Sequence, residues 1–282
     1  MRSSFTADVL AWGVPRLRDL PWRRTRDPWA VLVSEVMLQQ TQVSRVMPRW
    51  QSFLSRFPTT AACAGASLAD VLREWQGLGY PRRARNLRAT AQQVEALGGF
   101  PRELEGLLAL PGVGSYTARA LLAFAFELDV AVVDTNVARV YARVGGERLT
   151  PGRVQAAADA AIPRGDAWMW NQCLMDLGAV LCRPASPRCF ECPLAEQCVW
   201  KRDGGPDPAI GSANVSARQA RFEGSDRQAR GRLMKALAAG PVRRVDGAAV
   251  MGRDELIAAR LIDALLAEGM CQRDRSLLRL PE

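Results

Sequence analysis

Four cysteines lie within seventeen residues of one another and give the strongest sign of metal chemistry in this sequence. Cys182, Cys189, Cys192 and Cys198 follow the spacing C-x6-C-x2-C-x5-C. Four thiolates this close in sequence can converge on one metal centre, and soft sulfur ligands select zinc or an iron–sulfur cluster. Zinc modules usually place two short C-x2-C pairs a dozen or more residues apart, so the uneven spacing favours a [4Fe-4S] cluster. Zinc is the second interpretation, and two disulfides are the third.

Two carboxyl groups are candidates for acid–base chemistry. Glu35 lies in a helical pattern whose same face is otherwise apolar. An exposed glutamate is the default on a helix, but apolar surroundings would raise the pKa of this carboxyl and let it act as a general acid. Asp134 follows the apolar run 130–133 and precedes a helix expected from Asn136, which indicates an N-cap that favours the ionised form. One protonated and one ionised carboxyl are what acid-assisted cleavage of a glycosidic bond requires.

The segment Leu110–Ala118, with the sequence LPGVGSYTA, lies between two helical patterns. Its glycines allow a tight turn and leave N–H groups at the start of the next helix, where phosphate binds readily. An ordinary helix–helix turn is the alternative. The flanking residues favour a helix-hairpin-helix near 102–127 that holds a DNA backbone through Gly112, Val113 and Gly114.

Two further segments could contact bases. Tyr80 ends the segment WQGLGY, where an aromatic ring after a flexible glycine could wedge into a base stack, although a core tyrosine is the ordinary alternative. The amides of Gln39–Gln42, which include Gln40, could read base edges or simply solvate a helix end.

Composition narrows the chemistry. The 282-residue chain has a net charge of +9, typical of a nucleic-acid partner or another acidic surface. Arginine supplies 36 of the 38 cationic side chains, since Lys201 and Lys235 are the only lysines, and there is no histidine. Imidazole catalysis is excluded, and residues 1–200 offer no side-chain amine for a Schiff base. We expect a cytoplasmic, nucleoid-associated protein, because neither a secretory signal nor a membrane-spanning run is evident.

Helical periodicity dominates the chain and predicts an all-α fold. We expect a catalytic domain over residues 1–200, a linker over 201–224 and a small winged-helix-like module over 225–282. That module should contain helices at 226–239 and 254–268 and a turn at Gly269. The other helices are expected at 5–14, 28–43, 46–56, 68–75, 82–96, 102–109, 115–127, 136–144, 151–162 and 167–181.

Taken together, these motifs resemble the helix-hairpin-helix base-excision glycosylases that carry a four-iron cluster, and more narrowly the MutY family of adenine glycosylases. The resemblance runs from about residue 6 to 200 and implies a two-lobed helical fold with an iron–sulfur loop over 182–198. It is carried by the strings LPW at 20–22, SEVMLQQTQ at 34–42, GLGY at 77–80, ARNL at 84–87, LPGVG at 110–114, DTN at 134–136 and MDLGA at 175–179, followed by the four cysteines.

The resemblance implies roles for the candidate catalytic residues. Glu35 would protonate adenine at N7, and Asp134 would stabilise the oxocarbenium-like intermediate. Tyr116 stands where bifunctional relatives place a lysine, and Asn136 would support the sugar and phosphate.

The resemblance also implies how duplex DNA would be held. Gln40 and Tyr80 would enter the base stack, while Arg18 and Trp22 would line the pocket for the flipped base. Extrusion is required on physical grounds, because a stacked base shields its glycosidic bond. The [4Fe-4S] cluster would be structural and would face DNA.

The expected activity is monofunctional removal of adenine opposite 8-oxoguanine or guanine by a monomer that has no contact with membranes. Pro81 and Thr135 are mild departures from the family pattern, which often has Tyr and Gly there. The β-rich, Nudix-like domain that the family often carries does not fit residues 201–282, so adenine removal is better supported than strict 8-oxoguanine discrimination. The alternatives are a thymine/uracil mismatch glycosylase and a non-catalytic DNA-binding iron–sulfur protein.

The C-terminal module carries several arginines with only scattered acids between them, which predicts a clamp on duplex phosphates. A solvated helical cap is the alternative. The arginines in question are Arg227, Arg230, Arg232, Arg243 and Arg244.

Overall fold

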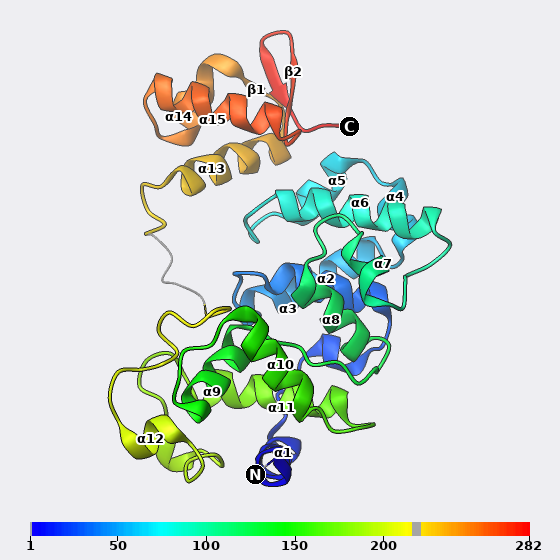
Figure 1. Ribbon diagram of the computed structural model, residues 1–282. Coiled ribbons are helices and arrows are strands. Elements are labelled where there is room, and N and C mark those ends of the chain that lie inside the picture. The colour runs from blue at the N-terminus through cyan, green and yellow to red at the C-terminus, as the bar shows by residue number, and fades with distance from the viewer. Residues whose placement is uncertain (1, 216–220) are drawn as a thin grey trace. The chain divides into compact units, whose positions relative to one another are not determined.

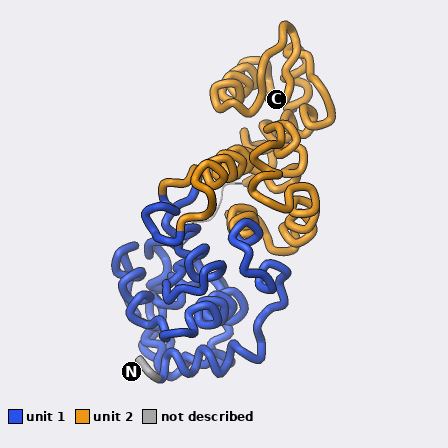
Figure 2. The backbone as a smooth tube through the Cα atoms, turned by 90° about the vertical axis from the view of Figure 1, so that its right-hand side faces the viewer, with its two compact units in different colours: residues 1–31, 102–108, 113–218 blue, residues 32–101, 109–112, 219–282 orange. Residues whose placement is uncertain are grey.

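The computed structural model describes residues 2–215 and 221–282 and confirms a mostly helical fold with one small C-terminal sheet (Figure 1). The chain forms two compact units, each built from separate segments (Figure 2). Unit 1 contains residues 1–31, 102–108 and 113–218, and unit 2 contains 32–101, 109–112 and 219–282. The linear division at residues 200 and 224 stays a prediction, and residues 216–220 of the expected linker lie outside the described part.

Unit 1 is organised around α11 (Ala167–Val180), whose residues 170–178 are all buried. Helix α1 (Arg2–Gly13) packs along it, with the Phe5 ring edge-on to Trp170 at 5.5 Å. The other helices of this unit are α7 (Leu104–Leu108), α8 (Ser115–Phe124), α9 (Thr135–Gly145), α10 (Pro151–Ala161) and α12 (Val199–Asp203), with short 3-10 turns at Val14–Arg16, Pro21–Arg24 and Cys189–Glu191.

Helix α2 (Pro28–Leu38) begins in unit 1, and its residues from Leu32 onward belong to unit 2. Asp27 caps this helix, because its carboxylate accepts hydrogen bonds from the Trp29 and Ala30 amides at 3.1 and 3.3 Å. The helix ends five residues earlier than predicted, since Gln40 adopts a left-handed φ of 56°. The remaining helices here are α3 (Val43–Arg56), α4 (Thr60–Gly65), α5 (Leu68–Glu74) and α6 (Arg82–Ala96).

The end of the chain forms the expected winged-helix-like module. Helices α13 (Asp226–Ala239) and α15 (Glu255–Ala267) match their predicted positions closely. Strands β2 (Gln272–Asp274) and β3 (Leu277–Arg279) form a hairpin, and β1 (Val242–Arg243) pairs antiparallel with β3 in the order β1-β3-β2. The short β1 and α14 (Gly247–Met251) gave no periodic signal in the sequence, because neither exceeds five residues.

No helix in the described ranges combines the length and the apolar character needed to cross a bilayer.

A buried ion cluster ties the segment before α2 to α11. Asp176 is 1% exposed and accepts two hydrogen bonds from the Arg23 guanidinium, both at 2.8 Å. Its carboxylate also accepts from the backbone N–H and the Nε of Arg18, at 2.9 and 2.7 Å. Burial by itself would raise the pKa of Asp176, but the hydrogen bonds from Arg23 and Arg18 outweigh burial and hold the pKa below its ordinary value.

We expect Asp176→Asn to lower the free energy of unfolding by about 3–5 kcal/mol, because a buried guanidinium loses its counter-charge. Since the pKa of Asp176 is lower in the folded state, this stabilisation is fully present above about pH 4 and is lost as the pH falls further. Urea unfolding of both proteins between pH 3 and 7 tests this. A difference that stays constant across that range would contradict the assignment of the stabilisation to the ionised carboxylate.

Candidate functional site

Asp134 caps helix α9, as the sequence predicted. Its backbone is extended, one carboxylate oxygen accepts a hydrogen bond from the Val137 amide at 2.7 Å, and the other accepts from the Asn136 side chain at 2.8 Å. Both oxygens are thus held in fixed directions at the N-terminal end of the helix.

The expected preference of Asp134 for the ionised form is corrected by its surroundings. Burial raises the pKa of Asp134 above its ordinary value, and the hydrogen bonds from Val137 and Asn136 and the charge of Arg139 only partly oppose this effect. A helix N-terminus lowers the pKa of a nearby carboxyl group, but the desolvation that tertiary packing imposes on Asp134 raises its pKa by more.

Asn136 is held in turn by Arg139, one turn further along α9. The Arg139 guanidinium donates to the Asn136 amide oxygen at 2.8 Å, to the Gly178 carbonyl at 2.8 Å and to the Cys182 carbonyl at 2.6 Å. A side chain at Gly178 would place its Cβ 2.7 Å from the Asn136 Cβ, so glycine is required where α11 passes α9. Asp134, Asn136 and the start of the cysteine loop therefore form one hydrogen-bonded network.

Glu35 lies inside α2, in a stretch from Val31 to Met37 that is buried throughout. Glu35 is only 5% exposed, and its neighbours Ser34 and Val36 are also buried. The burial expected from the apolar face of this helix is confirmed, and burial by itself disfavours the charged form of a carboxyl group.

The predicted helix-hairpin-helix turn joins α7 to α8. Gly112 has a φ of +76°, and a Cβ there would lie 2.8 Å from the Asn86 Cβ, so only glycine fits. Val113 is buried, which leaves only its backbone for a ligand. Gly114 is exposed and precedes the first turn of α8, which no side chain caps and which carries the half-buried Tyr116.

Gln40 and Tyr80 share an unusual backbone. Both are exposed residues in the left-handed region, with φ of 56° and 48°, where non-glycine residues are rare. Such strain persists only where neighbouring structure imposes it, and it is concentrated at functional positions.

One arginine imposes this conformation on both turns. The Arg83 guanidinium donates to the Gln39 carbonyl at 2.8 Å, at the end of α2, and to the Gly79 carbonyl at 3.0 Å, beside Tyr80. Burial lowers the pKa of Arg83 to about 10, so it remains charged at neutral pH. Its further acceptors are the carbonyls of Val36, Met37 and Leu78 and the hydroxyl of Thr41. No sequence motif pointed to Arg83, because the acceptors at the end of α2 lie more than forty positions away.

Arg18 and Trp22 belong to unit 1 with Asp134, Asn136 and Tyr116, whereas Glu35, Gln40 and Tyr80 belong to unit 2. Trp22 is buried, and the Arg18 guanidinium is 2.6 Å from Asp176. The structure therefore gives Arg18 a definite ion-pair partner that the sequence did not reveal.

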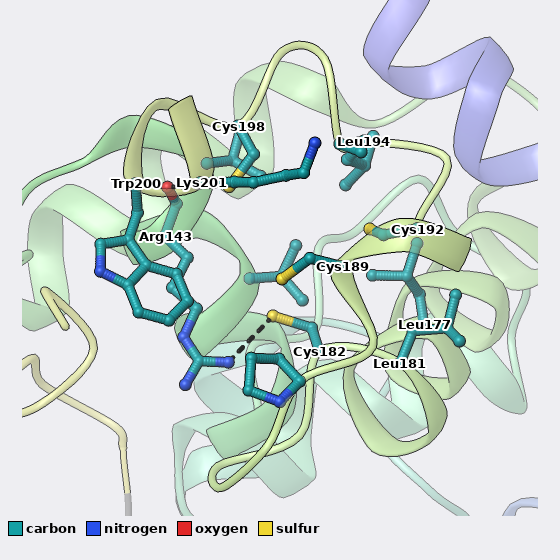
Figure 3. Close-up of a pocket in the computed structure, with 14 residues that line it drawn as sticks. Arg143, Leu177, Leu181, Cys182, Cys189, Cys192, Leu194, Cys198, Trp200 and Lys201 are labelled. Atoms are coloured by element: carbon teal, nitrogen blue, oxygen red, sulfur yellow. Dashed lines mark hydrogen bonds between the residues drawn. The ribbon is translucent and has the colours of Figure 1, made fainter. Parts of the chain in front are cut away.

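The four cysteines of the loop line one pocket, and Figure 3 shows their sulfur atoms directed into it. All seven cysteines are free thiols, so the disulfide interpretation finds no support. Within residues 2–215 and 221–282 no three Cys, His, Asp or Glu side chains are placed to hold a single metal ion. The space among the lining residues is about 380 Å³, part of it open to solvent. Four thiol groups around one pocket are a donor set that fits a [4Fe-4S] cluster, since soft sulfur ligands hold iron–sulfur clusters and zinc.

Arg143, also on α9, holds the start of the cysteine loop through hydrogen bonds. It donates to the carbonyls of Arg183 and Pro184 at 2.8 and 3.1 Å and lies 3.4 Å from the Cys182 sulfur (Figure 3). Its guanidinium also pairs with Asp207 at 2.6 Å. No local pattern pointed to Arg143, because its side-chain partners are thirty-nine or more positions away.

The five arginines of the C-terminal module that the sequence suggested as a phosphate clamp all contact partners within the protein, and the clamp stays a prediction. Arg227 contacts Tyr80, Arg230 contacts Glu268, Arg232 contacts the Met251 carbonyl, Arg243 contacts Asp246, and Arg244 contacts Asp263.

Comparison with known proteins identifies the class first. Residues 33–164 match the family model of the HhH-GPD superfamily base excision DNA repair protein. A solved structure of a thermostable thymine-DNA glycosylase superposes with a TM-score of 0.67 at 28% identity, covering 72% of this chain and 97% of that one. An endonuclease III–DNA complex, at 23% identity and a TM-score of 0.63, shares the fold.

Curated relatives narrow the class. The chain is 42% identical to the adenine DNA glycosylase of Mycolicibacterium smegmatis, over 94% of this chain and 92% of the relative. It is also 42% identical to that of Mycobacterium tuberculosis and 40% identical to the human enzyme, of which it covers 42%. The chain belongs to the adenine DNA glycosylase family.

We expect Arg83→Gln to reduce the free energy of unfolding by about 3 kcal/mol, because several buried carbonyls lose a charged donor. Arg83→Lys should recover only part of this loss, since an ammonium lacks the planar fork that spans both turns. Urea unfolding measures the stability of both variants. If Arg83→Lys proved as stable as the unchanged chain, the bridging role of the guanidinium would be wrong.

Proposed function

We propose that this chain is a monofunctional glycosylase that removes adenine paired with 8-oxoguanine or guanine by hydrolysing its N-glycosidic bond. Membership of the family makes it an adenine DNA glycosylase of base excision repair. The observation that carries the chemical proposal is the buried Glu35, an acid placed in an apolar stretch of α2.

In this proposal Glu35 donates the proton that makes adenine a better leaving group. A buried carboxyl retains its proton more readily than an exposed one, and general acid catalysis needs a donor that is still protonated near neutral pH. The proton passes to the base, most productively at N7, while the bond from the base to the sugar lengthens.

Asp134 opposes the positive charge that then develops on the sugar. Both of its oxygens accept hydrogen bonds, which keeps the carboxylate aimed in one direction. The desolvation that raises its pKa also strengthens its attraction for a cation, because charges interact more strongly at low dielectric. Asn136 and Arg139 act as positioning residues through this carboxylate.

The absence of an amine supports hydrolysis without strand cleavage. Tyr116 lies in the first turn of α8, and residues 1–200 contain no lysine that could form a Schiff base with the sugar. Water is therefore the proposed nucleophile.

Three features support binding to duplex DNA. The uncapped first turn of α8 after Gly114 offers amides to a phosphate. Gln40 and Tyr80 are exposed on strained turns and are proposed to enter the base stack. Arg18 and Trp22 are proposed to lie near the extruded adenine.

Cys182, Cys189, Cys192 and Cys198 are proposed to ligate a [4Fe-4S] cluster. When bound, the cluster would cross-link residues 182–198 into a single rigid loop. Arg139 and Arg143 already hold the start of this loop through its carbonyls. The cluster has a structural place in this proposal and takes no part in base release.

Removal of thymine or uracil is the competing activity, suggested by the fold shared with the thymine-DNA glycosylase. The higher identity to adenine glycosylases over nearly the whole chain favours adenine. Duplexes carrying A, T or U opposite 8-oxoguanine or guanine separate the two activities by which base is released.

We expect Glu35→Gln to abolish adenine release while duplex binding persists, because an amide keeps the shape of the side chain but cannot donate the proton. Asp134→Asn should slow release by about a hundredfold or more, since the charge facing the developing cation is lost. Single-turnover assays and binding titrations on an A:8-oxoguanine duplex measure both effects. Substantial release by Glu35→Gln would show that another group is the acid.

We expect anaerobically purified protein to contain about four iron and four sulfide ions per chain. Cys192→Ser should reduce the iron content and the yield of folded protein, whereas Cys63→Ser, at a buried cysteine outside the loop, should leave the iron content unchanged. Elemental analysis and visible absorption provide the measurement. One zinc per chain without iron would refute the cluster.

A further inference from the structure

The C-terminal module contacts the turn that carries Tyr80. The Arg227 guanidinium, in the first turn of α13, donates a hydrogen bond to the Tyr80 hydroxyl at 2.9 Å. Both residues belong to unit 2 although 147 positions separate them. The proposed removal of adenine does not require this contact between Arg227 and Tyr80.

The contact is one of several between the module and the helices around Tyr80. The Gln76 side chain donates to the Met234 carbonyl of α13 at 3.4 Å, and Arg85 of α6 donates to the Glu268 carbonyl after α15. The Glu268 carboxylate is in turn gripped by both guanidinium nitrogens of Arg230, at 2.9 and 2.5 Å. These contacts fix the C-terminal module against α5 and α6, and they place Arg227 beside Tyr80.

The Tyr80 side chain is held by two guanidinium groups from different parts of unit 2. Arg83 lies 5.5 Å and Arg227 lies 5.9 Å from the ring centroid, both within cation–π range. Arg227 also lies 5.3 Å from the ring of Phe222, which is 47% exposed. Arg83 fixes the backbone of the turn, and Arg227 fixes the hydroxyl end of the ring.

We propose that Arg227 is a positioning residue for Tyr80, through which the C-terminal module sets the entry of this ring into the base stack beside the base opposite adenine. This inference rests on the proposed function, in which Tyr80 enters the duplex. A ring already held in one orientation loses less conformational freedom on insertion, so the module would strengthen discrimination between 8-oxoguanine and guanine without touching either base.

Arg227→Gln tests the inference in the full-length chain, with Arg279→Gln as the matched control. Arg279 lies in the same module, is exposed and pairs with Asp274 at 3.1 Å, so its substitution removes the same charge elsewhere. The readouts are single-turnover adenine release from A:8-oxoguanine and A:G duplexes, and the fluorescence of 2-aminopurine placed next to the opposite base, which rises when the stack opens. Unchanged thermal unfolding establishes that both variants are folded.

We expect Arg227→Gln to lower the ratio of the two release rates, and the 2-aminopurine signal, about fivefold to tenfold. Arg279→Gln should leave both unchanged, and Arg227→Lys should recover part of the loss. Equal behaviour of Arg227→Gln and Arg279→Gln would overturn the inference, whereas failure of the unchanged chain to release adenine would overturn the proposed function instead.

Tyr80→Phe separates positioning from a simple phosphate contact. This variant keeps the ring but removes the hydroxyl that Arg227 holds. If Arg227 acts through that hydroxyl, adding Arg227→Gln to Tyr80→Phe should change the ratio by less than twofold. A full further loss in the double variant would show that Arg227 does not act through the Tyr80 hydroxyl and would refute this positioning role.

Discussion

Hydrogen bonds from buried and half-buried guanidinium groups hold the loops that carry the proposed functional residues. Arg83 joins the end of α2 to the Tyr80 turn, Arg139 and Arg143 hold the start of the cysteine loop, and Arg23 binds Asp176. A planar fork can satisfy acceptors from two segments at once, which a lysine ammonium does poorly. This requirement gives a structural reason for part of the excess of arginine over lysine, beyond any attraction to phosphate.

Desolvation is the second constraint on the site, and it acts on both proposed catalytic carboxyls. Glu35 is buried in α2, and burial by itself disfavours the charged form of a carboxyl group. Asp134 is desolvated too, yet its oxygens accept hydrogen bonds from Val137 and Asn136. In the proposed function, burial favours a proton donor at Glu35, and the hydrogen bonds to Asp134 aim its carboxylate as a counter-charge.

The C-terminal module shows that arginines in a basic segment can also serve contacts within the protein. Arg230 pairs with Glu268 and Arg243 pairs with Asp246 inside the module, whereas Arg227 contacts Tyr80 outside it. Exposed pairs such as Arg243–Asp246 contribute little stability. The module's contact with Tyr80 is more specific, because it joins two segments remote in sequence.

The sequence by itself determined the family, the helical class, the grouping of the four cysteines, the capping role of Asp134 and the glycine turn at Gly112. These features depend on residue types and on short spacings along the chain, so they can be predicted from local sequence. Tertiary structure alone decided the raised pKa of Asp134, the early end of α2 and the partners of Arg18, Arg83 and Arg227. Desolvation and long-range hydrogen bonds depend on which segments meet in space, and no local pattern records that.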